Sequence, residues 1–163
     1  MSNADKTRIK YLVRSLRMVP HPEGGFYKEV YRCRNKVSIR AKLRCAITDI
    51  YFLLTQGQVS RFHRITSDEI WHFYEGGPLE ITEVTPGTLK ESKTTIGNTG
   101  TVLQYKHLIK AGNWQAARPL GRYTLVGCTV APGFEFEDFE LLKNNPSMRE
   151  KIIKKHPGLR KLI

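Results

Sequence analysis

Apolar and polar residues alternate in short runs along most of the chain, a pattern typical of β-strands that bury one face. These runs are rich in β-branched and aromatic residues, and glycine and proline separate them. We predict strands at residues 26–33, 45–54, 58–64, 69–75, 79–85, 101–109, 114–117 and 122–131. Short strands at this spacing indicate a closed β-barrel or a jelly roll.

The two ends of the chain follow a helical period instead. Apolar residues recur at helical spacing behind Asp5, a good N-cap, which predicts a helix over residues 5–18. Near the C-terminus, Asn145 and Pro146 form a helix-start signal, so we predict a second helix over residues 146–155. A strand-rich middle is therefore preceded by one helix and followed by short helices.

Length and composition bound the organisation of the chain. With 163 residues and 40% hydrophobic content, we expect a single domain over residues 1–163, with a barrel core at about 24–132 and a C-terminal helical segment at about 136–163. No apolar run is long enough to cross a bilayer, and the N-terminus lacks a signal-peptide core. We expect a soluble, intracellular, cytoplasmic protein with reduced cysteines and no membrane partner.

The charge is strongly basic, because 27 lysines and arginines against 15 acids give a net charge of +12. The basic residues are spread along the chain, with mild concentrations at Arg32–Arg44 and Arg149–Lys161, and no nucleic-acid module accompanies them. We expect the excess to serve solubility and to attract anions. No sequence-specific nucleic-acid partner is predicted.

The densest chemistry lies in the stretch SRFHRITSDEIWHFYEGGPLEI. Strand alternation predicts that Arg61 and His63 share one face of a strand. The same rule places Glu69, Trp71 and Phe73 together on one face of the next strand. We therefore expect polar groups to converge across a hairpin.

This stretch resembles the first motif of the cupin family, in which paired histidines are followed by a glutamate, six further residues and a glycine. Glu69 and Gly76 match that spacing, and His63 matches the second histidine with one extra residue before the glutamate. Arg61 stands where the first histidine is expected.

The second cupin motif, proline, any residue, glycine, two residues and histidine, is similar to residues 110–115. Its proline and its histidine are both replaced, and Gln115 takes the place of the last ligand. The match extends over residues 21–142 through the strings HPEGGFYKEVYR, FHRITSDEIWHFYEGGPLEI, AGNWQAARP and YTLVGCTVAPGFEFEDFELL, which look like the signatures of a small uncharacterised cupin family.

The resemblance implies an all-β fold, the double-stranded β-helix or cupin jelly-roll barrel, commonly found as a homodimer. The structural kin of this family include germins, seed storage proteins, and sugar isomerases and epimerases. The resemblance thus supplies a fold together with several alternative functions.

A divalent metal is one alternative for the site, although the identity of any cofactor stays open. His63, Glu69 and Gln115 offer an imidazole, a carboxylate and an amide oxygen, with waters filling the other positions. The charge of Arg61 would repel the ion, so this site would be weak, and nickel, zinc, iron and manganese all suit it equally.

The same region suits a small anionic or sugar-like ligand. Arg61 can fork onto a carboxylate or phosphate, and Arg118 is a second clamp unless it pairs with nearby acids such as Glu137 or Asp138. The candidate walls for a ring are Trp71, Phe73 and Trp114, each of which suits a barrel core at least as well.

Proton transfer is the predicted chemistry of such a site. His63, beside Asp68 or Glu69, can move a proton near neutral pH, which is what an isomerase or epimerase requires. The stretch HPEGG is predicted to be a turn that leads into the first strand, from which Glu23 and Tyr27 can reach the barrel mouth.

Whether the protein is an enzyme stays open. A non-catalytic ligand-binding or storage-like cupin and a weak-metal cupin enzyme are the alternatives, with a nucleic-acid binder behind them. What discriminates is whether His63 and Glu69 face a solvent-connected cavity or are consumed by internal hydrogen bonds.

Overall fold

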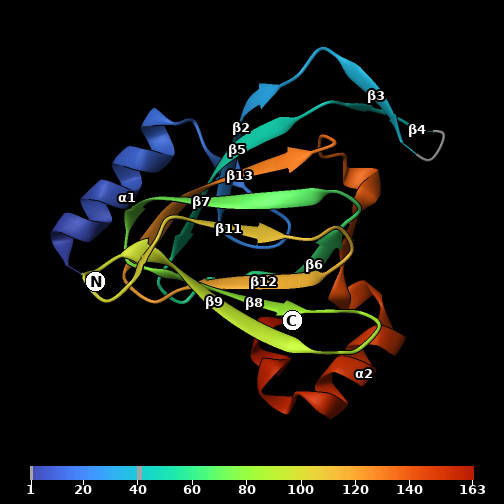
Figure 1. Cartoon of the computed structure of the whole chain (residues 1–163). Coiled ribbons are helices and arrows are strands. Elements are labelled where there is room, and N and C mark those ends of the chain that lie inside the picture. Colours follow the sequence, from blue (N-terminus) through green and yellow to red (C-terminus); the bar gives the residue numbers. More distant parts are fainter. Residues whose placement is uncertain (1, 40–41) are drawn as a thin grey trace.

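The computed structural model describes residues 2–39 and 42–163, which form two packed antiparallel β-sheets with a helix at each end of the chain (Figure 1). The predicted all-β jelly roll is confirmed. Within the described residues no helix is long and apolar enough to cross a membrane.

Each of the two main sheets contains six strands. In spatial order, the first sheet consists of β1 (Val19–Pro20), β2 (Phe26–Arg32), β5 (Thr48–Thr55), β13 (Tyr123–Ala131), β7 (Asp68–Gly76) and β11 (Lys106–Ile109). The second consists of β10 (Leu103–Gln104), β9 (Glu91–Asn98), β8 (Leu79–Val84), β12 (Trp114–Pro119), β6 (Ser60–Ile65) and β14 (Phe139–Leu141). β3 (Lys36–Ile39) and β4 (Lys42–Cys45) pair only with each other and project from the body as an arm (Figure 1).

The main core lies between the two sheets. Inward-facing residues alternate with outward-facing ones along each strand, as a half-buried sheet requires. Phe52 and Trp71 from the first sheet meet Leu79 and Ile81 from the second, and all four are at most 1% exposed. This packing fixes the separation of the sheets and hence the space available for a site.

The N-terminal helix α1 (Asn3–Ser15) packs on the outer face of the first sheet through Leu12, which joins Leu53 and Leu125 in a second cluster. The predicted bounds, residues 5–18, are wrong by about one turn. Ser2 is the N-cap, and Asp5 is the third helical residue, whose carboxylate accepts a hydrogen bond from the Ser2 backbone N–H. This reciprocal capping box satisfies two donors at the helix start.

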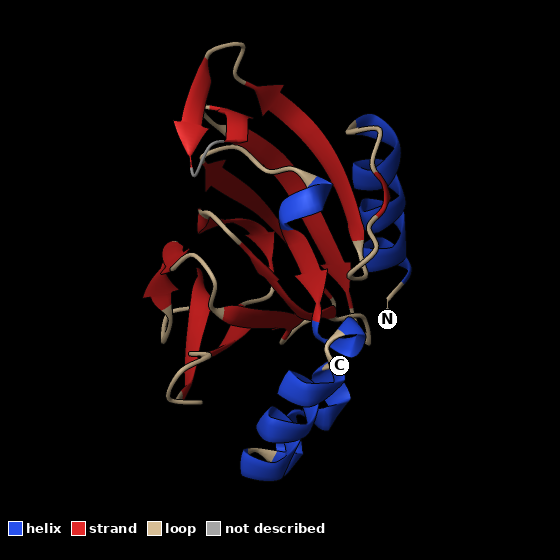
Figure 2. Ribbon diagram, turned by 90° about the vertical axis from the view of Figure 1, so that its right-hand side faces the viewer, coloured by secondary structure: helices blue, strands red, loops and turns tan. Residues whose placement is uncertain are grey.

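The C-terminal segment covers the outer face of the second sheet (Figure 2). It contains η2 (Leu142–Asn144), α2 (Pro146–Lys155) and η3 (Pro157–Leu162). The preceding short helix η1 (Phe136–Asp138) lies apart from these helices, and its Phe136 faces the space between the sheets. The predicted helix 146–155 is confirmed, and Asn145 caps it by accepting a hydrogen bond from the Met148 N–H. Ile152 and Leu159 pack against Trp114, so the terminal helices share a core with the barrel.

Four short strands, β1, β3, β4 and β14, lie outside the predicted ranges except at Cys45, and two further stretches differ from the prediction. β9 was missed because its sequence, ESKTTIGN, is mostly polar and buries only Ile96 and Gly97. Residues 101–109 were predicted as one strand but form β10 and β11, which belong to different sheets. The chain crosses between the sheets at Tyr105, and an alternating pattern does not reveal such a crossing.

Candidate active site

A cavity of about 220 Å³ opens between the sheets and is lined from both of them. Its polar and ionisable lining consists of His21, Glu23, Tyr27, Glu29, Arg32, Thr48, His63, Glu69 and Cys128. Its apolar lining consists of Ile50, Ile65, Val130, Phe134, Phe136 and Phe139. Two of the predicted catalytic residues, His63 and Glu69, therefore face one cavity from opposite sheets.

His63, on β6, is held by two acceptors at the same ring nitrogen. Its Nδ1 lies 2.8 Å from the carbonyl oxygen of Arg61 and 3.0 Å from Oε2 of Glu23. Neither acceptor can donate when Glu23 is ionised, so Nδ1 carries a hydrogen whether the ring is neutral or charged. Nε2 is therefore the nitrogen that gains or loses the proton.

The ion pair with Glu23 controls the charge of His63. Burial is the largest single influence and opposes the charged imidazolium, but the Glu23 carboxylate, together with the Glu69 carboxylate and the Arg61 carbonyl, outweighs it and raises the pKa of His63 to about 9. Burial also favours a neutral Glu23, yet the nearby imidazolium prevails and lowers the pKa of this carboxyl. At neutral pH the pair is a buried imidazolium and a carboxylate.

Glu23 comes from the HPEGG stretch, the predicted turn from which Glu23 can reach the barrel mouth, and it lines the cavity together with Tyr27. Its backbone carbonyl accepts a hydrogen bond of 2.8 Å from the Arg61 N–H, which pins the loop to β6. Gly24 has a φ of +112°, and a Cβ there would collide with the carbonyl oxygen of Val59. The glycine is thus required for the close approach that brings the carboxylate to His63.

Glu69, on β7, is oriented by a chain of hydrogen bonds that starts at Trp71. The indole Nε1–H donates to Oε1 of Gln115 at 2.9 Å, and Gln115 Nε2 donates to Oε2 of Glu69 at 2.5 Å. Since an indole nitrogen only donates, the orientation of the amide is fixed. The Cys128 thiol also lies within hydrogen-bonding reach of this carboxylate. The hydrogen bond from Gln115 engages Oε2, so Oε1 is the oxygen that can take a proton or a ligand.

Burial makes Glu69 a weaker acid than an ordinary glutamate. Loss of solvent raises the pKa of this carboxyl, and the attraction of the His63 imidazolium offsets only part of that rise. Cys128 also lines the cavity, and burial raises the pKa of its thiol well above the ordinary value. The thiol therefore stays protonated and is no nucleophile at neutral pH.

Arg61 does not share a face with His63, so the prediction from strand alternation is wrong at this point. Gln115 pairs with His63 but Ala117 pairs with Ser60, a shift of register that marks a β-bulge between them. Across a bulge two residues oppose one, and the alternation of faces is interrupted. Arg61 is exposed, and its Nη1 donates to the Ile163 carbonyl at 2.8 Å.

The predicted aromatic walls lie in the core rather than along the cavity. Trp71 is 1% exposed and acts through Gln115, as described above. Trp114 is fully buried beneath the C-terminal helices, and the guanidinium of Arg64 lies 4.8 Å from its ring centre. Phe73 packs against the core between the sheets.

The remaining predicted charged residues also lie outside the cavity lining. Arg118 pairs with neither Glu137 nor Asp138, because its Nε donates to Glu80 at 2.7 Å. Asp68 accepts a hydrogen bond of 2.8 Å from the Ala111 N–H and so stabilises a loop. The structure thus brings together His63, Glu69 and Gln115 of the predicted set and places the other candidates elsewhere.

A comparison with models of protein families identifies the family of this chain. The profile of the Cupin superfamily (DUF985) matches residues 10–142. The chain belongs to the cupin superfamily. The uncharacterized Saccharomyces cerevisiae protein YML079W is 25% identical over 163 residues, spanning 88% of this cupin and 80% of the yeast protein.

Solved structures agree with this assignment. Protein SO0799 from Shewanella oneidensis is 32% identical, with a TM-score of 0.81 and coverage of 99% of this cupin and 98% of that chain. A hypothetical protein from Leishmania major is 29% identical, with a TM-score of 0.77 over 90% and 96% of the two chains. Oxalate decarboxylase from Bacillus subtilis, at 16% identity and a TM-score of 0.58 over 87% of this cupin and 34% of that chain, shows the common fold alone.

The donors of this cupin do not fit a divalent metal. The Gln115 oxygen accepts from the Trp71 indole, and its nitrogen donates to Glu69, so the amide directs an N–H rather than an oxygen toward the carboxylate. His63 holds a proton at Nε2 at neutral pH, because its pKa is raised to about 9. In the described part of the chain no three His, Cys, Asp or Glu residues are grouped so as to hold an ion. We therefore derive no chemical step through a metal.

Several lining residues were not recognised in the sequence as site residues. His21 and Arg32 flank the first long strand, and Phe134, Phe136 and Phe139 follow the last one. The alternating phenylalanines of the string GFEFEDF were the available signal, because period-2 aromatics outside a predicted strand must find a surface to cover.

Proposed function

We propose that this cupin binds a small sugar-like molecule in the cavity and catalyses proton transfer on it, as an isomerase or epimerase does. The observation that carries the proposal is the meeting of His63 and Glu69 in one cavity. Each residue uses one polar atom for internal hydrogen bonds: His63 uses Nδ1, and Glu69 uses Oε2. Each keeps the other atom for a ligand.

The two groups suit opposite roles in an enolisation. When a C–H bond next to a carbonyl breaks, the proton passes to Oε1 of Glu69, and the electron pair moves to the carbonyl oxygen. That oxygen is stabilised by the Nε2–H of His63, which donates a hydrogen bond or the proton itself. Return of the proton to the same or a neighbouring carbon gives the epimer or the isomer.

Glu23 and Gln115 hold these groups in place. The Glu23 carboxylate stabilises the imidazolium that must donate, and Gln115 turns the second oxygen of Glu69 toward the cavity. A raised pKa makes ionised Glu69 a stronger base than an exposed glutamate, which favours removal of a proton from carbon.

The sugar-like alternative has more support than the anionic one. Arg61 and Arg118, the predicted anion clamps, lie outside the cavity lining and bind the Ile163 carbonyl and Glu80. Hydroxyl and carbonyl groups can still be recognised by the polar atoms of His63 and Glu69.

Proton transfer can be tested without knowing the natural substrate. A panel of aldoses and ketoses would be incubated with the protein in D2O, and proton NMR would follow loss of the signal of the hydrogen next to the carbonyl. We expect exchange with at least one sugar, and Glu69→Gln should slow it by about 10²–10⁴-fold, the usual contribution of a general base.

Glu80→Gln is the matched control, because it removes a carboxylate that pairs with Arg118 away from the cavity. It should leave exchange unchanged. Exchange that survives in both Glu69→Gln and His63→Gln would refute the assignment of these residues. A sugar that binds in the cavity without exchange would favour the non-catalytic, ligand-binding cupin.

We also propose that the protein is a homodimer joined along β2. β1 pairs only with Phe26 and Tyr27, so within the described residues the outer edge of β2 from Lys28 to Arg32 has no strand beside it. Val30 and Tyr31 on this stretch are 46% and 53% exposed. A second copy would cover both the unpaired backbone and these side chains through a two-fold contact.

Sedimentation equilibrium at micromolar concentration tests the dimer. Wild type should sediment as a dimer, and Tyr31→Glu should shift it toward monomer by burying a charge in the interface. Tyr105→Glu changes a tyrosine elsewhere that is 46% exposed, against 53% for Tyr31, and should leave the dimer intact. A monomeric wild type would exclude the arrangement.

A further inference from the structure

We propose that the cavity selects uncharged, ring-bearing molecules, and that Glu29 and Glu135 are the residues that exclude anions by occupying Arg32. The inference rests on the proposed function, because it concerns the ligand of the same cavity. It adds a rule of charge selection that His63 and Glu69 do not supply.

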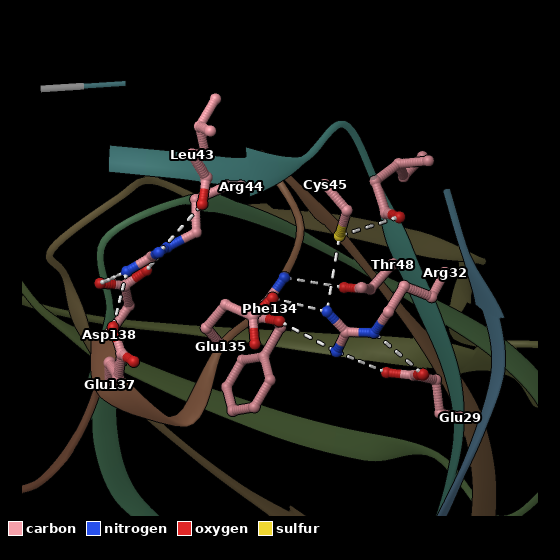
Figure 3. Close-up of polar contacts among 11 residues, drawn as sticks. Glu29, Arg32, Leu43, Arg44, Cys45, Thr48, Phe134, Glu135, Glu137 and Asp138 are labelled. Atoms are coloured by element: carbon pink, nitrogen blue, oxygen red, sulfur yellow. Dashed lines mark hydrogen bonds and ion pairs between the residues drawn. The ribbon is translucent and has the colours of Figure 1, made fainter. Parts of the chain in front are cut away.

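Arg32 is the one lysine or arginine among the described residues that line the cavity. An anion entering the cavity would therefore be expected to bind to it. Figure 3 shows the guanidinium at the centre of a set of acceptors supplied by β2, β4 and the segment after β13. Its availability decides whether the cavity can hold an anion.

All five N–H groups of Arg32 are already directed at partners. Nε and Nη2 donate to the two oxygens of Glu29 at 3.1 and 2.8 Å. Nη1 donates to Glu135 at 2.7 Å and to the Cys45 sulfur at 3.6 Å, and Nη2 also donates to the Phe134 carbonyl at 3.1 Å (Figure 3). A guanidinium has five donors, so none remains for a ligand carboxylate or phosphate.

The charge of Arg32 is also more than balanced. Two carboxylates, Glu29 and Glu135, pair with this single cation. Deeper in the cavity His63 is neutralised by Glu23, and Glu69 adds a further carboxyl. The side chains of Arg32, Glu29 and Glu135 are 36%, 40% and 35% exposed, so these three residues form the solvent-facing end of the cavity. An anion bound there would lose part of its hydration and meet mainly negative charge, which is unfavourable.

The aromatic part of the lining favours a ring. Phe134 and Phe136 lie with their ring centres 5.1 Å apart in an edge-to-face arrangement, and Phe139 lies 5.3 Å from the imidazole of His63. Aromatic faces pack against the C–H groups of a sugar or carbocycle. The volume of about 220 Å³ is smaller than the roughly 300–1,000 Å³ of typical drug-sized pockets, so one ring is the expected size.

Two pairs of probes that differ only in charge test the inference. Glucose and glucuronate share one ring, as do benzyl alcohol and benzoate. Each would be titrated into isotope-labelled protein, and NMR would follow the backbone amides of Glu23, His63, Glu69 and Cys128. We expect the uncharged member of at least one pair to bind at these residues, with its charged counterpart at least about tenfold weaker because it is desolvated without a free cation.

The double variant Glu29→Gln/Glu135→Gln should shift the selectivity of the cavity toward anionic probes. Both replacements keep the size of the side chain and remove the charges that occupy Arg32, so the guanidinium becomes available to a carboxylate. We expect glucuronate or benzoate to gain affinity by about tenfold or more relative to the uncharged partner. Glu80→Gln, which frees the distant Arg118, is the control and should leave the ratio unchanged.

Two results would overturn the inference. The first is that wild-type protein binds the anionic probe of a pair at the cavity residues as tightly as the uncharged probe. This result would not contradict proton transfer by Glu69. The other is a selectivity ratio that the double variant does not change. If none of the four probes perturbs the cavity residues, the inference also fails, whereas the proposed function fails only if hydrogen exchange is insensitive to Glu69 and His63.

Discussion

Glu23 Oε2 lies 3.0 Å from His63 Nδ1, so the loop before β2 in one sheet and strand β6 of the other sheet share a buried ion pair. The side chains are 7% and 4% exposed, and the same imidazole nitrogen also meets the Arg61 carbonyl. The contact ties the two sheets together at the point where the cavity forms. Its consequences for stability can be measured separately from any activity.

The pair should make the stability of the protein depend on pH above neutrality. The pKa of His63 is raised from 6.5 to about 9 on folding, so the folded state binds the extra proton and gains stability that is fully present below pH 6.5. This stability is lost as the pH rises toward about 9. Urea unfolding across this range should show a fall for wild type that is absent from His63→Gln, and parallel pH profiles would contradict the pair.

Removing the carboxylate should be costly. Glu23→Ala leaves an imidazole that is either charged without a partner or neutral in a site built for charge, and we expect a loss of about 3–5 kcal/mol of unfolding free energy. Glu137→Ala removes a carboxylate that is 77% exposed and pairs with Arg44 at 3.2 Å, and it should cost at most about 1 kcal/mol. Equal losses in urea unfolding would show that the buried pair is no more important than the exposed one.

Gln115 should matter for stability through two buried partners at once. Gln115→Leu leaves the Trp71 N–H without an acceptor and Glu69 Oε2 without a donor, and each unsatisfied group costs about 1–3 kcal/mol. The exposed Gln104 is the control, and Gln104→Leu should stay within about 0.5 kcal/mol of wild type. A neutral Gln115→Leu would show that the amide does not orient Glu69.

The fold could be predicted from the sequence because most strands bury one face, so that apolar and polar residues alternate along them. The cupin spacing from Glu69 to Gly76 also identified the family from a single hairpin. The position of the Arg61 side chain could not be predicted from the sequence. A bulge between Ser60 and His63 reverses the expected face, and it arises from pairing with β12, which is distant in sequence.

The roles of Glu23 and Gln115 also depend on contacts that the sequence does not reveal. Glu23 lies in a loop, and only its pairing with a strand of the opposite sheet gives it a role. Gln115 was correctly placed near Glu69, yet its amide points its nitrogen at the carboxylate because Trp71 occupies the oxygen. Position follows from strand register, whereas hydrogen-bond direction depends on a third residue.

Divalent metals should not stabilise the protein. A metal that binds the native state raises Tm by mass action, but Gln115 directs an N–H rather than an oxygen toward Glu69, and His63 must first lose a proton. After treatment with a chelator, addition of nickel, zinc, iron or manganese at neutral pH should leave Tm unchanged. A stoichiometric metal in protein purified without a histidine tag, with a rise in Tm on its addition, would contradict this prediction.

The basic excess should give weak, unselective binding to polyanions. Residues 143–163 hold seven lysines or arginines and one acid, and residues 32–44 hold six and none, although Arg40 lies outside the described residues. These two regions are the C-terminal helical segment and the stretch containing the projecting arm (Figure 1). Arg32 lines the cavity, whereas none of the other described basic residues of these regions does. Contacts from such side chains would reach phosphates and carry no sequence information.

A competition experiment tests this assignment of the charge. Binding to a labelled oligonucleotide should weaken steeply as salt is raised and should be displaced equally well by the same oligonucleotide and by scrambled ones. Lys151→Glu/Lys154→Glu, on the surface of α2, should weaken the binding further, while hydrogen exchange of sugars in the cavity stays at the wild-type rate, since neither lysine lines it. Selective binding of one sequence at physiological salt would instead indicate a nucleic-acid function that the cavity does not explain.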